Sequence, residues 1–523
     1  MTSRHLFLAA LAALCAWHLV LRRHGLALPL MADEGEYACA ARAWAEGGLP
    51  YQDSSSQKPP MVFLLYRIAY AAQPQAPLAP RKLAIIWSLC AMVLLWRLTP
   101  EDWDPAARLT APAVFAVLST TPIGNFGFSA DTEVFLCTFV AAAAWALEKA
   151  RRRSRPGWLF LAGLCAGAAF MTKQTAAWTV TAFCVLAAWR GGATGWKRNC
   201  GLFAAGAAIL PVFWACYFWH RGALGPFWEQ VFRRNMAYAG VVWETGIAGS
   251  QLRWFFTTVA PLFLAGDWPV YATALFSLMR RRPGAESPET LATLWLSAAL
   301  LGAVTGWFLF PYYFLPVVPP LALAAAAGAQ QAARYWPRWR PAVWLLAVFC
   351  LYPAAVRNRA YFRDPPAALA RRLLYPNPMQ ESIIISDYIR EHSRPDEPLY
   401  IFGYEAQIYV YSHRKPAGNV FSYSLTLFPR HREDIEAELA RIAAARPRFI
   451  LYSNQPASTL IASALGAEFR DEVRKLIRRY YRWAGQVRIG PTGTLSRFGS
   501  DQVGPGEPDW TDEYSLFLFE RKS

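Results

Sequence analysis

The sequence is poor in charge and lacks the cysteine patterns of cross-linked or zinc-binding proteins. Asp, Glu, Lys and Arg make up 17% of the 523 residues, against about 25% in an average soluble protein. Nine cysteines are present, but none follows residue 350 and no two form a CxxC pair. A disulfide framework or a zinc site is therefore not expected. Hydrophobic residues make up 55% of the chain, which with the low charge indicates a membrane protein.

The positive charge that the chain carries, a net +17, is not arranged for nucleic acid. The arginines cluster between apolar segments, as the positive-inside rule predicts for cytoplasmic loops. Anionic lipid headgroups are the expected partners of these clusters, and no nucleic acid is expected. The clusters are Arg151–Arg153 with Arg155, Arg280–Arg282, and Arg334, Arg338 and Arg340.

Apolar runs divide the chain into a membrane part and a soluble part. A bilayer core about 30 Å thick needs about 20 residues of helix. We expect an α-helical polytopic membrane domain at 1–357, with about 11 spans and juxtamembrane helices in its first outer loop, and a small α/β domain at 376–523. The run behind Arg4 is expected to be an uncleaved first helix. The candidate spans lie near 5–22, 83–99, 106–122, 133–148, 158–171, 174–190, 201–219, 254–279, 291–309, 312–332 and 341–356.

Placing the arginine clusters in the cytoplasm determines which loops share the outer face. The loop around Asp131, the tight link that contains Lys173 and the C-terminal domain then lie outside, and the N-terminus lies inside. The first loop, 25–82, also lies outside if its apolar segment 59–73 runs along the membrane as an amphipathic helix and does not cross it.

The first loop carries a cluster of acidic side chains followed by a lysine. Asp33, Glu34 and Glu36 stand at the start of a helical pattern, and the spacing of three puts Asp33 and Glu36 on one helix face. Lys58 stands immediately before a Pro-Pro pair. Carboxylates beside a membrane are costly and usually functional. A solvated acidic loop is the alternative interpretation.

Transfer from a phosphate-activated donor needs three things that the outer face offers. A carboxylate must accept the proton of the attacking hydroxyl, cations must stabilise the departing phosphate, and a groove must hold a lipid tail. Structural alternatives remain open for several candidates: helix capping, snorkelling to the headgroups, and an interfacial aromatic belt. The candidates are the acids Asp33, Glu34, Glu36, Asp131 and Glu133, the cations Arg42, Lys58 and Lys173, and the polar or aromatic residues Tyr37, Gln57, Tyr312 and Tyr313.

The C-terminal domain shows short apolar strands without a catalytic motif. Runs at 399–403 and 449–453 predict buried strands, and the helical spacing of 430–446 predicts a strand–helix–strand unit. The domain contains no GxGxxG, GKS/T or nucleophile elbow, so no independent active site is expected there. The arginine-rich stretch 470–482 predicts either a solvated helix face or a surface that binds an acidic lipid acceptor.

Five stretches of the sequence resemble those of a known family. The chain is similar to the GT-C glycosyltransferases of the dolichyl-phosphate-mannose protein mannosyltransferase and aminoarabinose transferase type over roughly residues 1–335. Its C-terminal domain resembles the periplasmic domain of some bacterial members. The stretches, in the order of the family, are ADEGEYACAARAWAEGGLPYQD, QKPP, SADTEVFLCTFVAAAAWAL, GLCAGAAFMTKQTAA and YYFLPVVPPLALAAAAG.

The resemblance implies an inverting glycosyltransferase of the bacterial inner membrane. It would move a sugar from a polyprenyl-phosphate-linked donor to an extracytoplasmic acceptor, which is a lipid, a glycan or a protein. The resemblance places the acid of the first loop at Asp33, with Glu34 beside it, and the lysine that approaches the donor phosphate at Lys58. It places the second acid at Asp131 or Glu133.

Metal use is the point at which this chain departs from some members of the family. Those members carry an acidic residue, a metal ligand, just before the lysine, where this chain has Gln57. If a divalent metal is bound, Asp33 and Asp131 are its expected ligands. Two other functions stay open: a polytopic transporter or flippase without transferase activity, and a non-catalytic subunit whose soluble domain binds a partner.

Overall fold

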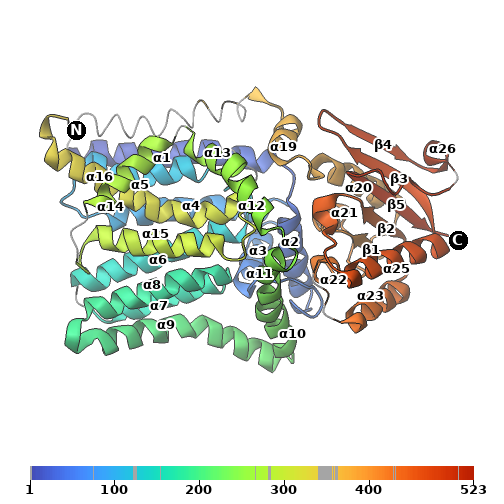
Figure 1. The fold of residues 1–523 in the computed structure, drawn as a ribbon, viewed down its shortest axis with the longest axis horizontal. Helices are drawn as coiled ribbons and strands as arrows, with labels where there is room; N and C mark the ends of the chain where they lie inside the picture. The colour runs from blue at the N-terminus through green and yellow to red at the C-terminus, as the bar shows by residue number, and fades with distance from the viewer. Residues whose placement is uncertain are drawn as a thin grey trace.

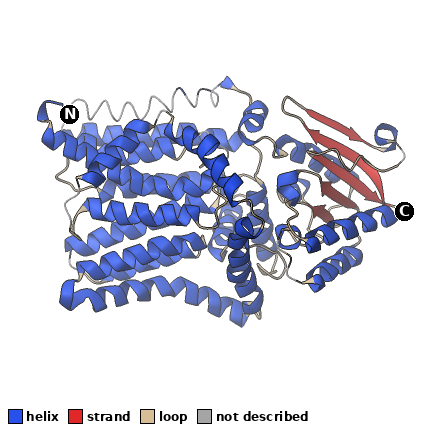
Figure 2. Ribbon diagram, in the orientation of Figure 1, coloured by secondary structure: helices blue, strands red, loops and turns tan. Residues whose placement is uncertain are grey.

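The computed structural model describes residues 3–522 except 75, 122–125, 154, 266, 281–283, 340–355, 357–358, 360–362, 428, 430 and 505. Long helices lie side by side in one part of the molecule, and a mixed sheet with covering helices forms the other (Figures 1 and 2). The predicted combination of a helical part and a small α/β domain is confirmed. The predicted span 341–356 and part of two arginine clusters lie outside the described residues.

The helical part contains the following elements, all before residue 340. The α-helices are α1 (Ser3–Arg23), α2 (Ala32–Ala45), α3 (Pro60–Ala72), α4 (Ala79–Leu98), α5 (Pro105–Leu118), α6 (Thr132–Arg153), α7 (Gly157–Phe170), α8 (Ala177–Arg190), α9 (Gly192–His220), α10 (Leu224–Trp228), α11 (Arg234–Glu244), α12 (Ala248–Trp254), α13 (Ala260–Leu264), α14 (Trp268–Met279), α15 (Pro288–Val304) and α16 (Val318–Tyr335). Short 3-10 or π segments are η1 (His24–Ala27), η2 (Gln174–Ala176), η3 (Glu229–Arg233), η4 (Phe255–Val259), η5 (Pro311–Val317) and η6 (Pro337–Trp339).

The α/β domain follows in the last third of the chain. Its helices are α19 (Pro366–Leu374), α20 (Met379–His392), α21 (Gln407–Ser412), α22 (Tyr423–Thr426), α23 (Arg432–Ala445), α24 (Pro456–Thr459), α25 (Ala464–Tyr480) and α26 (Ser500–Val503). Its strands are β1 (Leu399–Phe402), β2 (Phe449–Ser453), β3 (Tyr481–Ile489), β4 (Thr494–Phe498) and β5 (Ser515–Arg521).

Helix length and apolarity are those of a membrane bundle. Among the described residues, α4, α9 and the continuous η5–α16 segment are each long and apolar enough to cross a membrane, and the bent pair α12–α13 with α14 adds a fourth if it counts as one span. Shorter apolar helices include α3, α5, α7 and α15. The expectation of about 11 spans stays a prediction.

Helix α6 connects the two ends of the bundle. It has 22 residues, which correspond to about 33 Å of helix, close to the thickness of a bilayer core. Glu133 lies in its first turn and Arg151–Arg153 in its last. The carboxylate and the arginines therefore sit at the ends of the helix where the helix dipole favours them.

The first loop forms two short helices, α2 and α3, which lie between the bundle and the α/β domain (Figure 1). Helix α3 has 13 residues, about 20 Å of helix, so it is too short to cross a bilayer core. Helix α2 is rich in alanine and contains Gly35, and its residues 34–41 are all buried. Small side chains let neighbouring elements approach this helix closely from several sides.

Glu34 holds the first loop in place from inside the protein. Its carboxylate accepts from Arg81 of α4, with Nε to Oε1 at 2.7 Å and Nη2 to Oε2 at 2.5 Å. It also accepts from the backbone N–H of Met31 at 2.9 Å and of Ala130 at 2.8 Å. Both members of the ion pair are buried. The first loop therefore contacts the loop around Asp131 through Ala130, and the placement of both loops on the outer face stays a prediction.

The sheet of the α/β domain has the strand order β1-β2-β5-β3-β4. Strands β1 and β2 are parallel, and α23 connects them as the sequence predicts. The remaining pairs are antiparallel, and β3, β4 and β5 were not expected from the sequence. Several arginines of the stretch 470–482 pair with neighbouring acids, which favours the solvated helix face; the pairs include Arg470–Asp471, Arg478–Glu507 and Arg482–Glu520.

The α/β domain is docked on α2 through a continuous apolar core. One hydrophobic cluster includes Ala38 and Ala41 of α2 together with Ile408, Tyr409 and Val410 of α21. The close approach requires glycine at position 35. A Cβ atom on Gly35 would lie 2.1 Å from the backbone nitrogen of Gln407. The helix and the α/β domain are thus in backbone contact.

We expect Gly35→Ala to weaken this docking. The added methyl group overlaps backbone, which cannot rotate away, so the penalty should be about 1–3 kcal/mol. The matched control is Gly225→Ala, because a Cβ at Gly225 meets no atom within 4 Å. The melting temperature of the purified protein and protease cleavage between the two parts measure the effect. Equal melting temperatures for both variants would contradict the docking described above.

We expect Arg81→Met to destabilise the protein strongly. It leaves the buried Glu34 carboxylate without its cation, and breaking a buried pair in this way costs about 3–5 kcal/mol. Lys415→Met is the control, because Lys415 pairs with Glu46 at 2.6 Å on the surface, with side chains 77% and 56% exposed. An exposed pair contributes about 0–1 kcal/mol. Thermal unfolding in detergent compares the two; similar melting temperatures would show that the Glu34–Arg81 pair does not anchor the loop.

Candidate active site

Asp33 is the least buried of the three acids of the first loop. It lies in the first turn of α2 and is partly exposed, whereas Glu34 and Glu36 are fully buried. Its Oδ1 accepts a hydrogen bond from the phenolic hydroxyl of Tyr404 at 2.6 Å. Within the described residues, no group bonds to its second oxygen. Asp33 is therefore a carboxylate with one oxygen held and the other open.

Glu36 lies on the same face of α2, as its spacing from Asp33 predicts. Its Oε1 accepts from the hydroxyl of Ser56, and its Oε2 contacts the hydroxyl of Tyr404. Burial, and then the charge of Asp33, raises the pKa of Glu36 to about 7, although Lys58 opposes the shift. Glu36 is consequently partly protonated near neutral pH.

The backbone around Lys58 is fixed by the two prolines that follow it. A residue before proline is driven into an extended conformation, and Pro60 opens helix α3, where a missing N–H costs nothing. The Tyr51 hydroxyl donates to the Lys58 carbonyl oxygen at 2.7 Å, and the Lys58 N–H donates to Ser56 Oγ at 3.2 Å. The start of the Lys58 side chain is thus held firmly.

The Lys58 ammonium group is buried among carboxylates without pairing with any of them. The residue is 8% exposed, and its Nζ forms no hydrogen bond or ion pair in the part of the chain that the structure describes. Burial lowers the pKa of Lys58, but Asp33, Glu36 and Glu133 together outweigh it, so the pKa is raised above its ordinary value. Lys58 therefore stays protonated, and its ammonium group has no ion-pair or hydrogen-bond partner among the described residues.

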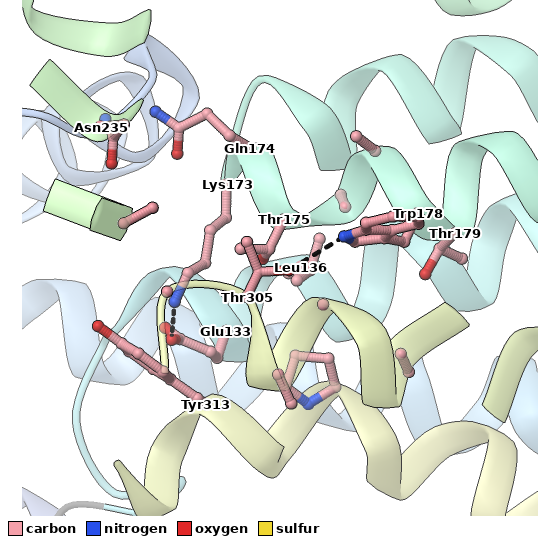
Figure 3. Close-up of a pocket in the computed structure, with 18 of the residues that line it drawn as sticks. Glu133, Leu136, Lys173, Gln174, Thr175, Trp178, Thr179, Asn235, Thr305 and Tyr313 are labelled. Atoms are coloured by element: carbon pink, nitrogen blue, oxygen red, sulfur yellow. Dashed lines mark hydrogen bonds and ion pairs between the residues drawn. The ribbon is translucent and has the colours of Figure 1, made fainter. Parts of the chain in front are cut away.

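Lys173, in contrast, is committed to Glu133 and Tyr313. Its Nζ donates to Glu133 Oε1 and lies 4.1 Å from the ring centroid of Tyr313 and 5.9 Å from that of Tyr312 (Figure 3). Burial lowers the pKa of Lys173, against the charge of Glu133. The tight link therefore lies against the start of α6 through this ion pair, and the role of Lys173 toward a substrate stays a prediction.

A cavity of about 420 Å³ opens beside these groups (Figure 3). Glu133 lines it from the first turn of α6, and Leu136 and Val140 line it from the next two turns. The cavity therefore runs from a polar end into the apolar interior of the bundle. Its polar lining includes Gln57, Lys58, Glu133, Lys173, Gln174 and Asn235, and its apolar lining includes Leu136, Val140, Trp295, Ala299 and Ala303.

Gln57 is one of the residues that line the polar end. Its carbonyl oxygen accepts from Gln174 Nε2 at 3.0 Å and from Asn235 Nδ2 at 2.6 Å. Its side-chain Oε1 is buried and has no hydrogen-bond partner within the described residues. A buried acceptor in this state is unfavourable without a ligand or water, so Gln57 has one side-chain acceptor available to either.

Seven of the predicted residues are not among those that line the cavity: Asp33, Glu34, Glu36, Tyr37, Arg42, Asp131 and Tyr312. Tyr37 packs edge-on against Tyr66, with ring centroids 5.6 Å apart. Arg42 lies over the ring of Tyr70 at 5.2 Å. Asp131 precedes α6 and accepts from the hydroxyl of Ser129; burial, and then the charges of Asp33 and Glu133, raises its pKa well above the ordinary value.

The sequence analysis missed Tyr404, Ser56, Gln174 and Asn235. Tyr404 comes from the α/β domain, yet it contacts both Asp33 and Glu36. A signal for it exists, because Tyr404 follows the carboxyl end of β1 and functional groups gather at the carboxyl ends of parallel strands. Nothing in the sequence shows that this edge faces the first loop.

The residues present do not fit the metal site that some relatives suggest. No group of three or more His, Cys, Asp or Glu side chains able to hold a metal ion occurs among the described residues. Asp33 is held by Tyr404, and the position before Lys58 is the amide Gln57, a weaker ligand for a divalent metal than a carboxylate. We therefore derive no step through a metal.

Comparison with known proteins gives a family match over part of the chain and several solved structures with a similar fold. Residues 57–219 match the family of dolichyl-phosphate-mannose-protein mannosyltransferase. No curated protein sequence matches the chain. The structure resembles ArnT from Cupriavidus metallidurans bound to undecaprenyl phosphate, with a TM-score of 0.59, 15% identity and 97% of each chain covered.

Two further solved structures are similar over almost the whole chain. One is the oligosaccharyltransferase AglB from Archaeoglobus fulgidus in complex with an inhibitory peptide and a dolichol-phosphate, with a TM-score of 0.52, 14% identity, and 99% of this chain and 76% of that chain covered. The other is the arabinofuranosyltransferase AftD from Mycobacteria, with a TM-score of 0.52, 14% identity, and 100% and 40% covered. The chain therefore has the GT-C fold of these structures, and its residues 57–219 match the dolichyl-phosphate-mannose-protein mannosyltransferase family.

Proposed function

We propose that this protein transfers a sugar from a polyprenyl-phosphate-linked donor to an acceptor on the outer side of the bacterial inner membrane, with inversion at the anomeric carbon. The observation that carries the proposal is the cavity with the uncommitted cation Lys58 at its polar end, beside the open carboxylate of Asp33. An anionic headgroup on an apolar chain is the ligand that matches such a cavity in both charge and polarity.

The apolar part of the cavity suits the lipid tail of the donor. Its lining comes from α6, α8 and α15, at residues such as Val140, Trp178 and Trp295. These helices lie in the bundle, so a polyprenyl chain leaving the cavity would continue into lipid. The structures of ArnT with undecaprenyl phosphate and of AglB with dolichol-phosphate support a lipid of this class.

The phosphate of the donor would pair with Lys58. A desolvated lysine that is not yet hydrogen-bonded to any carboxylate gains a charge-assisted hydrogen bond when a phosphate arrives. Lys173 already has Glu133 and the Tyr313 ring as partners, so it would position Glu133 and line the headgroup site. Gln57 would donate or accept one hydrogen bond there.

Asp33 would act as the general base. The acceptor hydroxyl oxygen forms a bond to the anomeric carbon, and the bond from that carbon to the phosphate oxygen breaks with its electron pair on the phosphate. The hydroxyl proton passes to the open oxygen of Asp33, and the lipid leaves as polyprenyl phosphate beside Lys58. Glu34 serves the reaction by position, since Arg81, Met31 and Ala130 occupy its oxygens.

We expect Asp33→Asn to reduce transfer about 10²- to 10⁴-fold, because the amide cannot accept the proton. Glu46→Gln is the matched control, since Glu46 follows the same helix and is 56% exposed. The assay uses a panel of labelled polyprenyl-phosphate sugars and acceptors and follows the release of free polyprenyl phosphate. Near-normal turnover in Asp33→Asn would contradict the assignment, and movement of intact lipid without release would indicate a flippase.

We expect Lys58→Gln to weaken binding of undecaprenyl phosphate about 10- to 100-fold, the value of one hydrogen bond to a charged group. Lys82→Gln is the control, because Lys82 is exposed and donates to Gln73 at 2.7 Å. Titration of the purified protein with undecaprenyl phosphate, followed by native mass spectrometry, gives both affinities. If the two variants bind equally well, the phosphate does not lie at Lys58.

A further inference from the structure

Tyr404 of the α/β domain is held rigidly at the edge of the candidate active site. It follows β1 directly after Gly403, whose φ of +131° an L side chain rarely adopts. Its backbone N–H donates to Ser458 Oγ at 2.6 Å. Its ring packs against Tyr423 and Phe421, with centroids 4.6 Å and 5.7 Å away. The phenol therefore has a defined position.

The segment after Tyr404 is fixed from both sides. Glu405 is buried and accepts from Ser453 Oγ at 3.1 Å and from Gln407 Nε2 at 3.2 Å. On the other side, Gly35 allows the backbone of Gln407 to lie against α2. The position of the Tyr404 hydroxyl relative to α2 is thus set by the sheet and by helix packing.

The contacts of this hydroxyl require a proton on one of the two acids. Tyr404 lies within hydrogen-bonding distance of Asp33 Oδ1, at 2.6 Å, and of Glu36 Oε2. A phenol has one proton to donate, so it can donate to one carboxylate only. The other contact is a hydrogen bond only if that carboxyl group is protonated and donates to the phenolic oxygen.

We propose that Glu36 and Tyr404 are positioning residues that form a directed chain, in which protonated Glu36 donates to the Tyr404 oxygen and Tyr404 donates to Asp33. This chain holds one oxygen of Asp33 and turns its open oxygen toward the acceptor. The C-terminal domain is then an integral part of the catalytic centre. The proposal rests on the function proposed above, because it assigns the proton arrangement of the same site.

The direction of the chain follows from the surroundings of the two acids. Glu36 is the more deeply buried, and its pKa is raised to about 7, whereas Asp33 is partly exposed and better solvated. Burial disfavours the ionised form of Glu36 more than that of a partly exposed acid, so the shared proton is placed on Glu36. Several titratable groups interact electrostatically or by a hydrogen bond with Glu36. They are Asp33, Tyr37 and Cys39 on its own helix, Tyr51 and Lys58 in the following loop, and Tyr404 and Tyr423 on the α/β domain.

The protons balance during one turnover. The acceptor proton moves to the open oxygen of Asp33, while Tyr404 and Glu36 keep their own protons. Asp33 then returns the accepted proton to water, to which it is partly exposed. A rise in pH through about 7 removes the proton from Glu36, breaks its bond to Tyr404 and places two anions on one helix face.

The variant that separates the proposal from a simple need for charge is Glu36→Gln. The amide N–H₂ can donate to Tyr404 as the protonated carboxyl does, so transfer should persist within about 3-fold of the wild type. In the wild type we expect kcat to fall above pH 7, where Glu36 loses its proton; in Glu36→Gln this fall should disappear. Glu36→Ala cannot donate this hydrogen bond, so it should lose transfer activity. A folded Glu36→Gln protein as inactive as Glu36→Ala would overturn the proposal, since it would show that the anion is required.

Tyr404→Phe removes the link while keeping the ring. We expect kcat to fall about 10- to 100-fold with an unchanged KM for the donor lipid. The matched control is Tyr411→Phe, because the Tyr411 hydroxyl also bonds to the first loop, accepting from the Leu30 N–H at 2.7 Å, but touches neither acid. If both variants lower kcat equally at equal melting temperatures, Tyr404 acts only in docking and the proposal fails.

A measurement independent of transfer separates this proposal from the proposed function. Infrared difference spectra of the resting protein should show a protonated carboxyl that titrates near pH 7. The band should be absent in Glu36→Gln and should titrate at lower pH in Tyr404→Phe, because the bond that protonated Glu36 donates to the Tyr404 oxygen favours the protonated form. A spectrum without this band overturns the proton chain even if the enzyme transfers sugar. If the band is present but the wild-type protein transfers no sugar, the proposed function is contradicted instead.

Discussion

The structure depends on how it accommodates several carboxylates buried at one end of a membrane bundle. Burying an ionised carboxylate costs several kcal/mol unless it is paired or hydrogen-bonded, and the acids here are accommodated in two ways. Glu34 has Arg81, Glu133 has Lys173, and Glu36 has hydroxyl partners and a raised pKa. This division leaves Asp33 with an open oxygen and Lys58 with an open charge, which are the two groups that the proposed reaction needs.

The same constraint explains why the α/β domain lies where it does. Gly35 and the alanines of α2 let α21 pack closely on this helix. Docking then brings Tyr404 over the acids. The apolar core that joins α2 and α21 and the polar contacts of the site are therefore two aspects of one interface, and weakening the first should disturb the second.

Much of the site could be predicted from the sequence because its residues are local. The spacing of Asp33 and Glu36 on one helix face, the proline pair after Lys58 and the tight link with Lys173 each follow from short-range rules. The partners could not be predicted, because Arg81 lies 47 residues from Glu34 and Tyr404 lies 371 residues from Asp33. Strand β4 is largely exposed and carries no apolar run, so no sequence pattern predicts it. Strand β5 does carry a buried apolar run, Leu516–Phe519, which is a signal that the sequence analysis did not use.

The most direct test of the central claim is an experimental structure of the protein with bound undecaprenyl phosphate. The account predicts density for the phosphate within hydrogen-bonding distance of Lys58 Nζ, and density for the first isoprene units along Leu136, Val140 and Trp295 in the cavity. The open oxygen of Asp33 should face the space next to that phosphate. A phosphate bound elsewhere, with Lys58 and the cavity empty, would contradict the account.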